Sequence, residues 1–234
     1  MLRLVRRRMR RILHRKAFLP LAAPQIALAL VLISHARADT SIIIYDSLGY
    51  ETGSGAGVDG PGSPFGLFAS GFSFVPATTL FFDSAQIEIG GFVNTQGLIG
   101  TNAFSLRLEA ADGPSGLPSS ILESFTIVGQ LQAFGSVHPA ITAQSLVHPV
   151  LQSGQKYWLV ALGEGDMQGA WNVTAPVARG DYYSIQGGRE VLLTDQELGA
   201  FRITGVTQVP EPTVVTFLSV FLTLFLVFAK KKNL

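Results

Sequence analysis

Histidine is scarce in this chain of 234 residues, so metal binding or acid–base chemistry would depend on few groups. His14 and His35 lie in a basic and apolar N-terminal segment, whereas His138 and His148 stand in the central part, each followed by a proline. A metal site usually needs three or four ligands, and no cluster of Asp, Glu or His surrounds either histidine. We therefore expect surface histidines, and we assign no metal and no cofactor.

Carboxylates are plentiful, but their spacing singles out no catalytic pair. The chain lacks a Gly-x-Ser-x-Gly motif, which excludes the nucleophile of an α/β-hydrolase. Glu164-Gly165-Asp166 offers two carboxylates for calcium, yet the loop spacing of an EF-hand is absent, so we expect an ordinary turn. We assign no catalytic residues. A polysaccharide-cleaving enzyme with a carboxylate pair stays open as the second of two alternatives to the non-enzymatic role described below.

Three aromatic residues are candidates for contact with a ligand: Trp171, Tyr182 and Tyr183. An exposed ring can stack on the C–H face of a sugar, as aromatic rings pack on other apolar surfaces. These rings make a carbohydrate-binding module the first alternative function. Trp158 differs, because it stands in a long apolar run and is expected in the core.

The net charge of +1 conceals a divided chain. Eight of the 17 basic residues lie within residues 1–16, and three more are Lys230–Lys232. Residues 39–212 contain five basic residues and all 16 acidic ones, which leaves a net charge of −11. An acidic domain repels phosphates, so we expect no nucleic acid partner. Cysteine is absent, so an exported domain would depend on its hydrophobic core rather than on disulfides.

Residues 1–38 have the organisation of a secretory signal peptide. A basic segment precedes an apolar stretch, densest at Ile26–Ile33, that is too short to span a bilayer. Ala36-Arg37-Ala38 then matches the small-x-small pattern that signal peptidase recognises. Ala36 and Ala38 are therefore the expected cleavage-site residues, and Asp39 is the expected N-terminus of the mature protein.

Residues 209–234 have the organisation of a membrane anchor. Thr213–Ala229 is uncharged and, at about 1.5 Å per residue, is long enough to cross a bilayer as a short helix. Lys230–Lys232 follow at once, and by the positive-inside rule they stay in the cytoplasm, which leaves the domain outside. Pro210 and Pro212 bracket Glu211 ahead of the helix and favour an extended segment there.

This order of tripeptide, apolar helix and basic tail resembles the PEP-CTERM sorting signal of Gram-negative bacteria. The resemblance covers about the last 26 residues, 209–234. It implies recognition by an exosortase, a membrane cysteine protease-transpeptidase. Pro210, Glu211 and Pro212 would then be the sorting motif, the helix would hold the substrate, and the tail would be discarded. The chain departs from the usual pattern in having a lysine tail and a helix without glycine.

The residues between the two ends, 39–208, have the pattern of one domain of short strands. Phe104–Glu109 alternates apolar and polar residues strictly, as a strand with one solvated face does. Further runs predict strands at residues 41–46, 79–89, 124–128, 144–151, 156–162, 170–174, 190–193 and 201–206. Turn signals such as Gln186-Gly187-Gly188 separate them. We predict an all-β fold, an antiparallel β-sandwich that is jelly-roll-like, plus one C-terminal transmembrane helix. The glycine-rich segment Gly49–Gly66 is expected to be a flexible loop.

The domain also resembles the choice-of-anchor β-domains of type R, which occur on bacterial surface proteins with interchangeable C-terminal anchors. The likeness lies in Tyr45–Gly49, in the strand and turn of Ser105–Leu122, and in Lys156–Val160 ahead of Trp171. That family brings no catalytic residues.

Together these features predict an exported protein, first anchored in the inner membrane and then held at the cell surface or in the extracellular matrix of a Gram-negative bacterium. We expect a non-enzymatic structural or adhesive role linked to extracellular polysaccharide. The expected partners are signal peptidase, an exosortase-type transpeptidase, the membrane and that polysaccharide.

Overall fold

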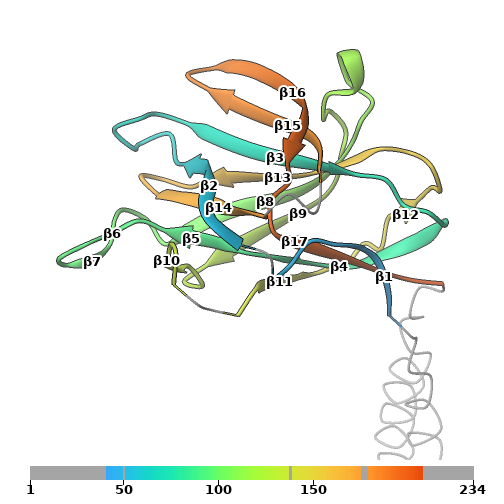
Figure 1. The fold of residues 1–234 in the computed structure, drawn as a ribbon, viewed down its shortest axis with the longest axis horizontal. Helices are drawn as coiled ribbons and strands as arrows, with labels where there is room; N and C mark the ends of the chain where they lie inside the picture. The colour runs from blue at the N-terminus through green and yellow to red at the C-terminus, as the bar shows by residue number, and fades with distance from the viewer. Residues whose placement is uncertain (1–40, 50, 137–138, 175–178, 208–234) are drawn as a thin grey trace, which may run out of the picture. The chain divides into compact units, whose positions relative to one another are not determined.

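Two facing β-sheets form most of the domain (Figure 1). The computed structural model describes residues 41–49, 51–136, 139–174 and 179–207. These residues belong to one unit, Thr40–Val209. In the described part of the chain the only helical element is a short 3₁₀ turn, η1 (Pro114–Gly116).

The smaller sheet has five strands, four of them in the order β1-β17-β4-β11; the fifth, β12, pairs with the start of β4, at Leu80 and Phe81. They are β1 (Ile42–Asp46), β4 (Leu80–Ile87), β11 (Ile141–Gln144), β12 (Val150–Leu151) and β17 (Phe201–Val206). All of their pairings are antiparallel. The sheet therefore joins the first and last strands of the described chain.

The larger sheet has ten strands, with the main order β10-β5-β14-β2-β3-β13-β8-β9. They are β2 (Glu51–Asp59), β3 (Phe68–Phe74), β5 (Ile89–Gly91), β8 (Ala103–Ala110), β9 (Ile121–Val128), β10 (Gln132–Ala133), β13 (Tyr157–Gly163), β14 (Gln168–Thr174), β15 (Arg179–Gln186) and β16 (Arg189–Glu197). β15 pairs with β3 and with β16, so a two-stranded ribbon branches from the main order. β10 and β5 are parallel, and a separate hairpin joins β6 (Val93–Asn94) to β7 (Gly97–Leu98).

The main core lies between the two sheets. Phe82 and Phe201 of the smaller sheet and Phe72, Leu106 and Leu159 of the larger one are buried in the same cluster. Full burial of a large apolar side chain stabilises a fold by about 1.5–3 kcal/mol, so this cluster holds the sheets together. The all-β, sandwich-like fold expected from the alternating runs is confirmed.

A second, smaller cluster covers the other face of the larger sheet. Trp158 and Val160 alternate along β13 with Leu159, so they point to the opposite face and pack there with Tyr183. Leu117 from the segment after β8 and Ile185 of β15 partly cover this cluster. Trp158 is fully buried, and its indole nitrogen donates a hydrogen bond of 2.9 Å to the Gly116 carbonyl. The expectation that Trp158 is a core residue is confirmed.

The prediction that the glycine-rich segment Gly49–Gly66 is a flexible loop is wrong for residues 51–59, which form strand β2. β2 pairs with β14 along its length. A Cβ atom on Gly55 would lie 2.7 Å from the Ala170 Cβ and 2.8 Å from the Phe134 ring. The missing side chain therefore provides space for its neighbours, a reason for glycine that turn-based reasoning overlooks.

Strands β3 and β15 were also missing from the predicted set, and the predicted strand at 144–151 is interrupted, since β11 ends at Gln144 and β12 begins at Val150. The expected signal peptide, the cleavage residues Ala36 and Ala38, the motif Pro210–Pro212 and the helix at 213–229 all lie outside the described residues. Within the described ranges, no helix has the length and apolar character needed to cross a membrane.

Candidate functional site

An open cleft lies where the larger sheet divides. β2 pairs with β3 at a single position, Asp59 with Phe68, whereas β15 pairs with β3 from Phe68 to Phe72. The β2–β14 pair and the β15–β16 ribbon therefore leave β3 separately, and the cleft lies between them. Its volume is about 380 Å³. The described residues that line it are Ser54, Gly55, Ala56, Phe72, Val173, Arg179, Tyr182, Gln196 and Glu197.

Tyr182 supplies the accessible aromatic ring of the cleft and is held from two directions. Its hydroxyl lies 3.1 Å from the Ser70 Oγ, which itself lies 2.6 Å from the Gly57 carbonyl oxygen. The Ser70 hydroxyl has one hydrogen, which it donates to that carbonyl, so the Tyr182 hydroxyl donates to Ser70. The Phe72 ring lies beside Tyr182 with its centroid 5.3 Å away. The ring is therefore fixed before any ligand arrives.

The floor of the cleft rests on the main core. Phe72 is almost completely buried, and its ring makes a T-shaped contact with Trp171, with centroids 5.1 Å apart and an interplanar angle of 85°. The Trp171 indole nitrogen donates to the Ala200 carbonyl at 3.1 Å. A Cβ on Gly199 would lie 2.5 Å from the Phe72 ring, so only glycine fits below it.

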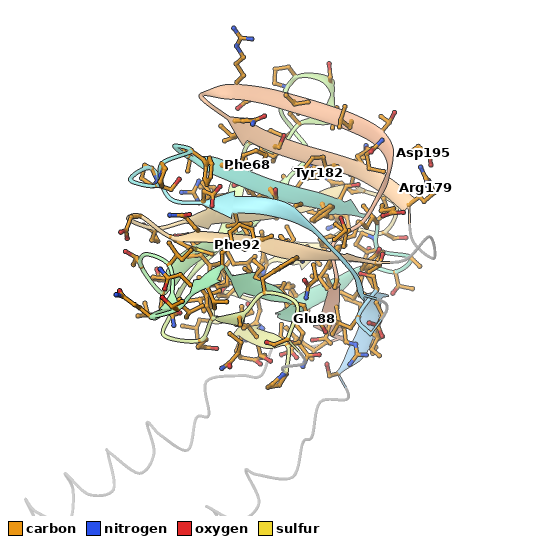
Figure 2. All side chains as sticks on the ribbon, turned by 60° about the vertical axis from the view of Figure 1, so that its left-hand side comes forward. Phe68, Glu88, Phe92, Arg179, Tyr182 and Asp195 are labelled. Carbon is orange, nitrogen blue, oxygen red and sulfur yellow. The ribbon has the colours of Figure 1, made fainter. Side chains whose placement is uncertain are left out.

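Charged and amide groups form the rim of the cleft on the β15–β16 ribbon. Arg179 is paired with Glu197 in the strand register, and its Nε donates to the Asp195 carboxylate at 2.7 Å. A second nitrogen of Arg179 donates to the Asp195 backbone carbonyl. The hydrogen bond and the charge of Asp195 raise the pKa of Arg179, so this residue stays cationic. Figure 2 shows Arg179 and Asp195 together at one end of the ribbon, with Tyr182 farther along it.

A bulge in β16 sets this arrangement. The register pairs Gly180 with Gln196 but Tyr182 with Leu193, so β16 has one extra residue between these pairs. Asp195 lies in the bulge with a positive φ of 55°, a conformation that aspartate tolerates better than most residues. The bulge brings Glu197 opposite Arg179 and directs both toward the cleft.

The three aromatic residues expected to form a ligand platform do not lie together. Trp171 is fully buried in the main core, so the expectation of an exposed ring is wrong for it. Tyr183 points to the opposite face from its neighbour Tyr182, as adjacent strand residues do, and it is buried there against Trp158. Its hydroxyl donates to Glu190 at 3.1 Å, and burial followed by that bond raises the pKa of Tyr183. Tyr182 alone is half-buried and lines the cleft.

Sequence reasoning missed the rim residues Arg179, Gln196 and Glu197. A signal for them was present in Gly187-Gly188, which both adopt positive φ and form the two-residue turn of a hairpin. Pairing residues outward from that turn predicts the register of the two strands, and it places Arg179 opposite Gln196, one residue away from its actual partner Glu197. The bulge that completes the register has no comparable signal in the sequence.

The other chemical candidates have structural explanations. Asp166 accepts hydrogen bonds from the Thr101 backbone nitrogen at 2.8 Å and from its hydroxyl at 2.6 Å, and this hydroxyl bond lowers the pKa of Asp166. Glu164-Gly165-Asp166 thus belongs to a hydrogen-bonded turn. His148 contacts the Phe82 carbonyl at 3.0 Å, while His138 lies outside the described residues. Among the residues with described positions, no group of three or more His, Asp or Glu could hold a metal ion.

Comparisons with protein-family models, with curated proteins and with solved structures gave no match for this chain. The case for its function therefore depends on the residues themselves.

Proposed function

We propose that the chain is an exported cell-surface protein of a Gram-negative bacterium, anchored in the membrane or processed by an exosortase, with a non-enzymatic structural or adhesive role linked to extracellular polysaccharide. The observation that carries this proposal is the match between the two expected processing points and the folded unit. That unit runs from Thr40 to Val209. The expected signal cleavage follows Ala38, and the sorting motif begins at Pro210. A self-contained domain between two removable ends is the organisation that export and anchoring require.

We further propose that the domain is a jelly roll. The smaller sheet has the order β1-β17-β4-β11, and part of the larger one has the order β3-β13-β8-β9. In both sheets an early strand lies beside a late one, as happens when two Greek keys wrap around each other. Jelly rolls commonly serve as capsid and lectin domains, which fits an adhesive role.

The lining of the cleft supports binding rather than hydrolysis. A glycosidase uses two carboxyl groups on either side of the bond that it cleaves. Of the described lining residues, Glu197 alone carries a carboxylate. Hydrolysis would need a second carboxylate in the cleft, whereas binding does not. We therefore propose a non-catalytic domain.

Mass spectrometry of both termini of the protein, isolated from cells of a host that contains an exosortase, tests the proposal. We expect the mature N-terminus at Asp39 and a C-terminus upstream of Leu234. Replacing Ala38 with a bulky residue such as Phe should block N-terminal maturation, because the peptidase accepts small side chains there. Recovery of mature protein that retains Met1 would overturn export, and retention of Leu234 in that host would overturn sorting.

A further inference from the structure

We propose that the cleft between β2 and the β15–β16 ribbon binds one neutral sugar unit, with the ring of Tyr182 as its stacking surface and Glu197 and Gln196 as its hydrogen-bonding rim. The sugar would be the ligand of the proposed adhesive protein, and the proposed function enters only in naming extracellular polysaccharide as its source. Trp171 and Tyr183, the other rings considered from the sequence, take no part because both are buried.

The size of the cleft suits a small ligand. Its volume of about 380 Å³ lies at the lower end of the range of roughly 300–1,000 Å³ typical of small-molecule sites. The cleft is open to solvent, so a longer chain could enter with one unit in the cleft and the rest outside. The site therefore fits a single unit of a polymer better than an enclosed metabolite.

The chemistry of the lining matches a polyhydroxylated ligand. A sugar presents an apolar C–H face and a ring of hydroxyl groups, each of which donates and accepts hydrogen bonds. Tyr182 offers an aromatic face, Glu197 accepts, and Arg179 carries donors beyond those it gives to Asp195. Such a mixture of an aromatic face and convergent polar groups is typical of ligand sites.

The charges of the rim argue against an anionic ligand. Arg179 is already paired with Asp195, and Glu197 adds a second carboxylate close to the same cation. The rim therefore carries an excess negative charge, which repels a uronate, sulfate or phosphate group. The same excess makes an amine the competing occupant, and the experiment below includes one.

The preorganised position of Tyr182 lowers the cost of binding. Its hydroxyl is fixed by Ser70, and Phe72 lies against its ring. A side chain that is already ordered loses little conformational entropy when a ligand arrives. Because the hydroxyl donates its hydrogen to Ser70, Tyr182 contributes its ring surface more than a donor to the ligand.

The experiment measures binding of methyl glycosides to the full-length protein in detergent by isothermal titration calorimetry. The probes are the methyl glycosides of glucose, galactose and mannose, with glucuronate and glucosamine as charged controls. We expect at least one neutral glycoside to bind with a dissociation constant on the order of 1 mM, since one small unit buries little surface. Glucuronate should bind more weakly than the matching neutral sugar.

Five variants assign the binding to the cleft. Tyr182→Ala should weaken it by about tenfold, because stacked rings are typical hot spots, whereas Tyr182→Phe should keep it. Glu197→Gln should weaken binding, while the matched change Glu190→Gln, on the same strand but outside the lining, should leave it unchanged. Ser54 is exposed, so Ser54→Phe should fill the cleft and abolish binding without lowering the melting temperature.

Three results would overturn the inference. They are no binding of any neutral glycoside in the panel, binding by Ser54→Phe equal to that of the wild type, or binding of glucosamine alone. The last result would make the cleft an amine site. None of these results would alter the mature termini measured above, so failure of the sugar site and failure of the proposed surface role are separable.

Discussion

At the scale of single residues, the two tryptophans support two different cores. Trp171 packs between the sheets against Phe72 and Phe201, and Trp158 packs on the opposite face of the larger sheet against Tyr183. Both are fully buried, and the nitrogen of each donates to a backbone carbonyl. Loss of either ring would leave a large cavity and remove the hydrogen bond that the indole nitrogen donates.

We therefore expect Trp158→Ala and Trp171→Ala each to lower the free energy of unfolding by roughly 3–5 kcal/mol, measured by urea denaturation. Replacement by Phe should cost less, because it keeps a ring and loses mainly the hydrogen bond. A loss for Trp171→Ala as small as that of a surface substitution would contradict its burial in the core.

Glu109 is a buried carboxylate whose charged form is disfavoured by its surroundings. It is buried opposite Trp158, and burial raises its pKa, with Arg107 opposing the shift and Asp112 adding to it. A raised folded-state pKa means that the native state holds its proton longer than the unfolded chain does. This contribution is most favourable below the unfolded pKa of about 4.3 and is lost as the pH rises through the folded value.

Glu109→Gln should therefore be more stable than the wild type at pH 7, and this advantage should disappear near pH 4. Thermal melting at the two pH values measures the effect. Asp166→Asn is the control of opposite sign, because the lowered pKa of Asp166 stabilises the fold above the unfolded value and is lost in acid. A Glu109→Gln variant that is less stable than the wild type at pH 7 would contradict the argument.

At the scale of elements, the packing of strand β2 depends on the absence of a side chain at Gly55. The Cβ position of Gly55 is only 2.7 Å from the Ala170 Cβ, whereas that of Gly57 lies 3.2 Å from the Phe68 ring. Neither glycine has a positive φ, so alanine is sterically acceptable to the backbone at both positions. The difference between them is therefore one of packing space.

Gly55→Ala should destabilise the domain by about 1–3 kcal/mol, as overpacking does, because β2 must move away from β14. Gly57→Ala should be close to neutral, since the ring can shift slightly and the unfolded chain loses about 0.4–1 kcal/mol of conformational freedom. Chemical denaturation of the two variants compares them directly. Equal losses would show that backbone freedom, rather than space, explains these glycines.

At the scale of the whole molecule, the proposed C-terminal sorting signal would have three parts with separate physical roles. A charge at the centre of a transmembrane helix costs about 2.5–3.5 kcal/mol on insertion scales, so Leu222→Asp should release the domain from the membrane. Changing Lys230–Lys232 to Gln should let part of the protein slip through the membrane, because in the proposed topology these residues only set orientation and stop translocation. Membrane fractionation measures both effects.

Glu211→Ala should leave insertion intact but stop removal of the tail, since Glu211 lies outside the expected helix and would act only through the exosortase. The uncut precursor should then accumulate in the inner membrane with Leu234 attached, as mass spectrometry can detect. If Glu211→Ala changes nothing and the wild type also keeps Leu234, the segment is a simple anchor and the sorting hypothesis fails.

The sequence by itself determined the class of fold and the positions of many strands. The strict alternation of Phe104–Glu109 and the apolar run around Trp158 predicted β8 and β13, because each pattern follows from the two-residue period of a strand. The sequence did not reveal β2, where Gly55 leaves space for Ala170 and Phe134 from other segments of the chain.

Only the tertiary structure decided which aromatic ring lines the cleft. Period-two alternation separates Tyr182 from Tyr183 but does not say which of the two faces is covered. That depends on the packing of β15 and β16 against β3, on the residues that bury Trp171 and Tyr183, and on the bulge at Asp195 that brings Glu197 opposite Arg179. These contacts join residues far apart in the chain, and a local pattern holds no information about which distant segments will meet.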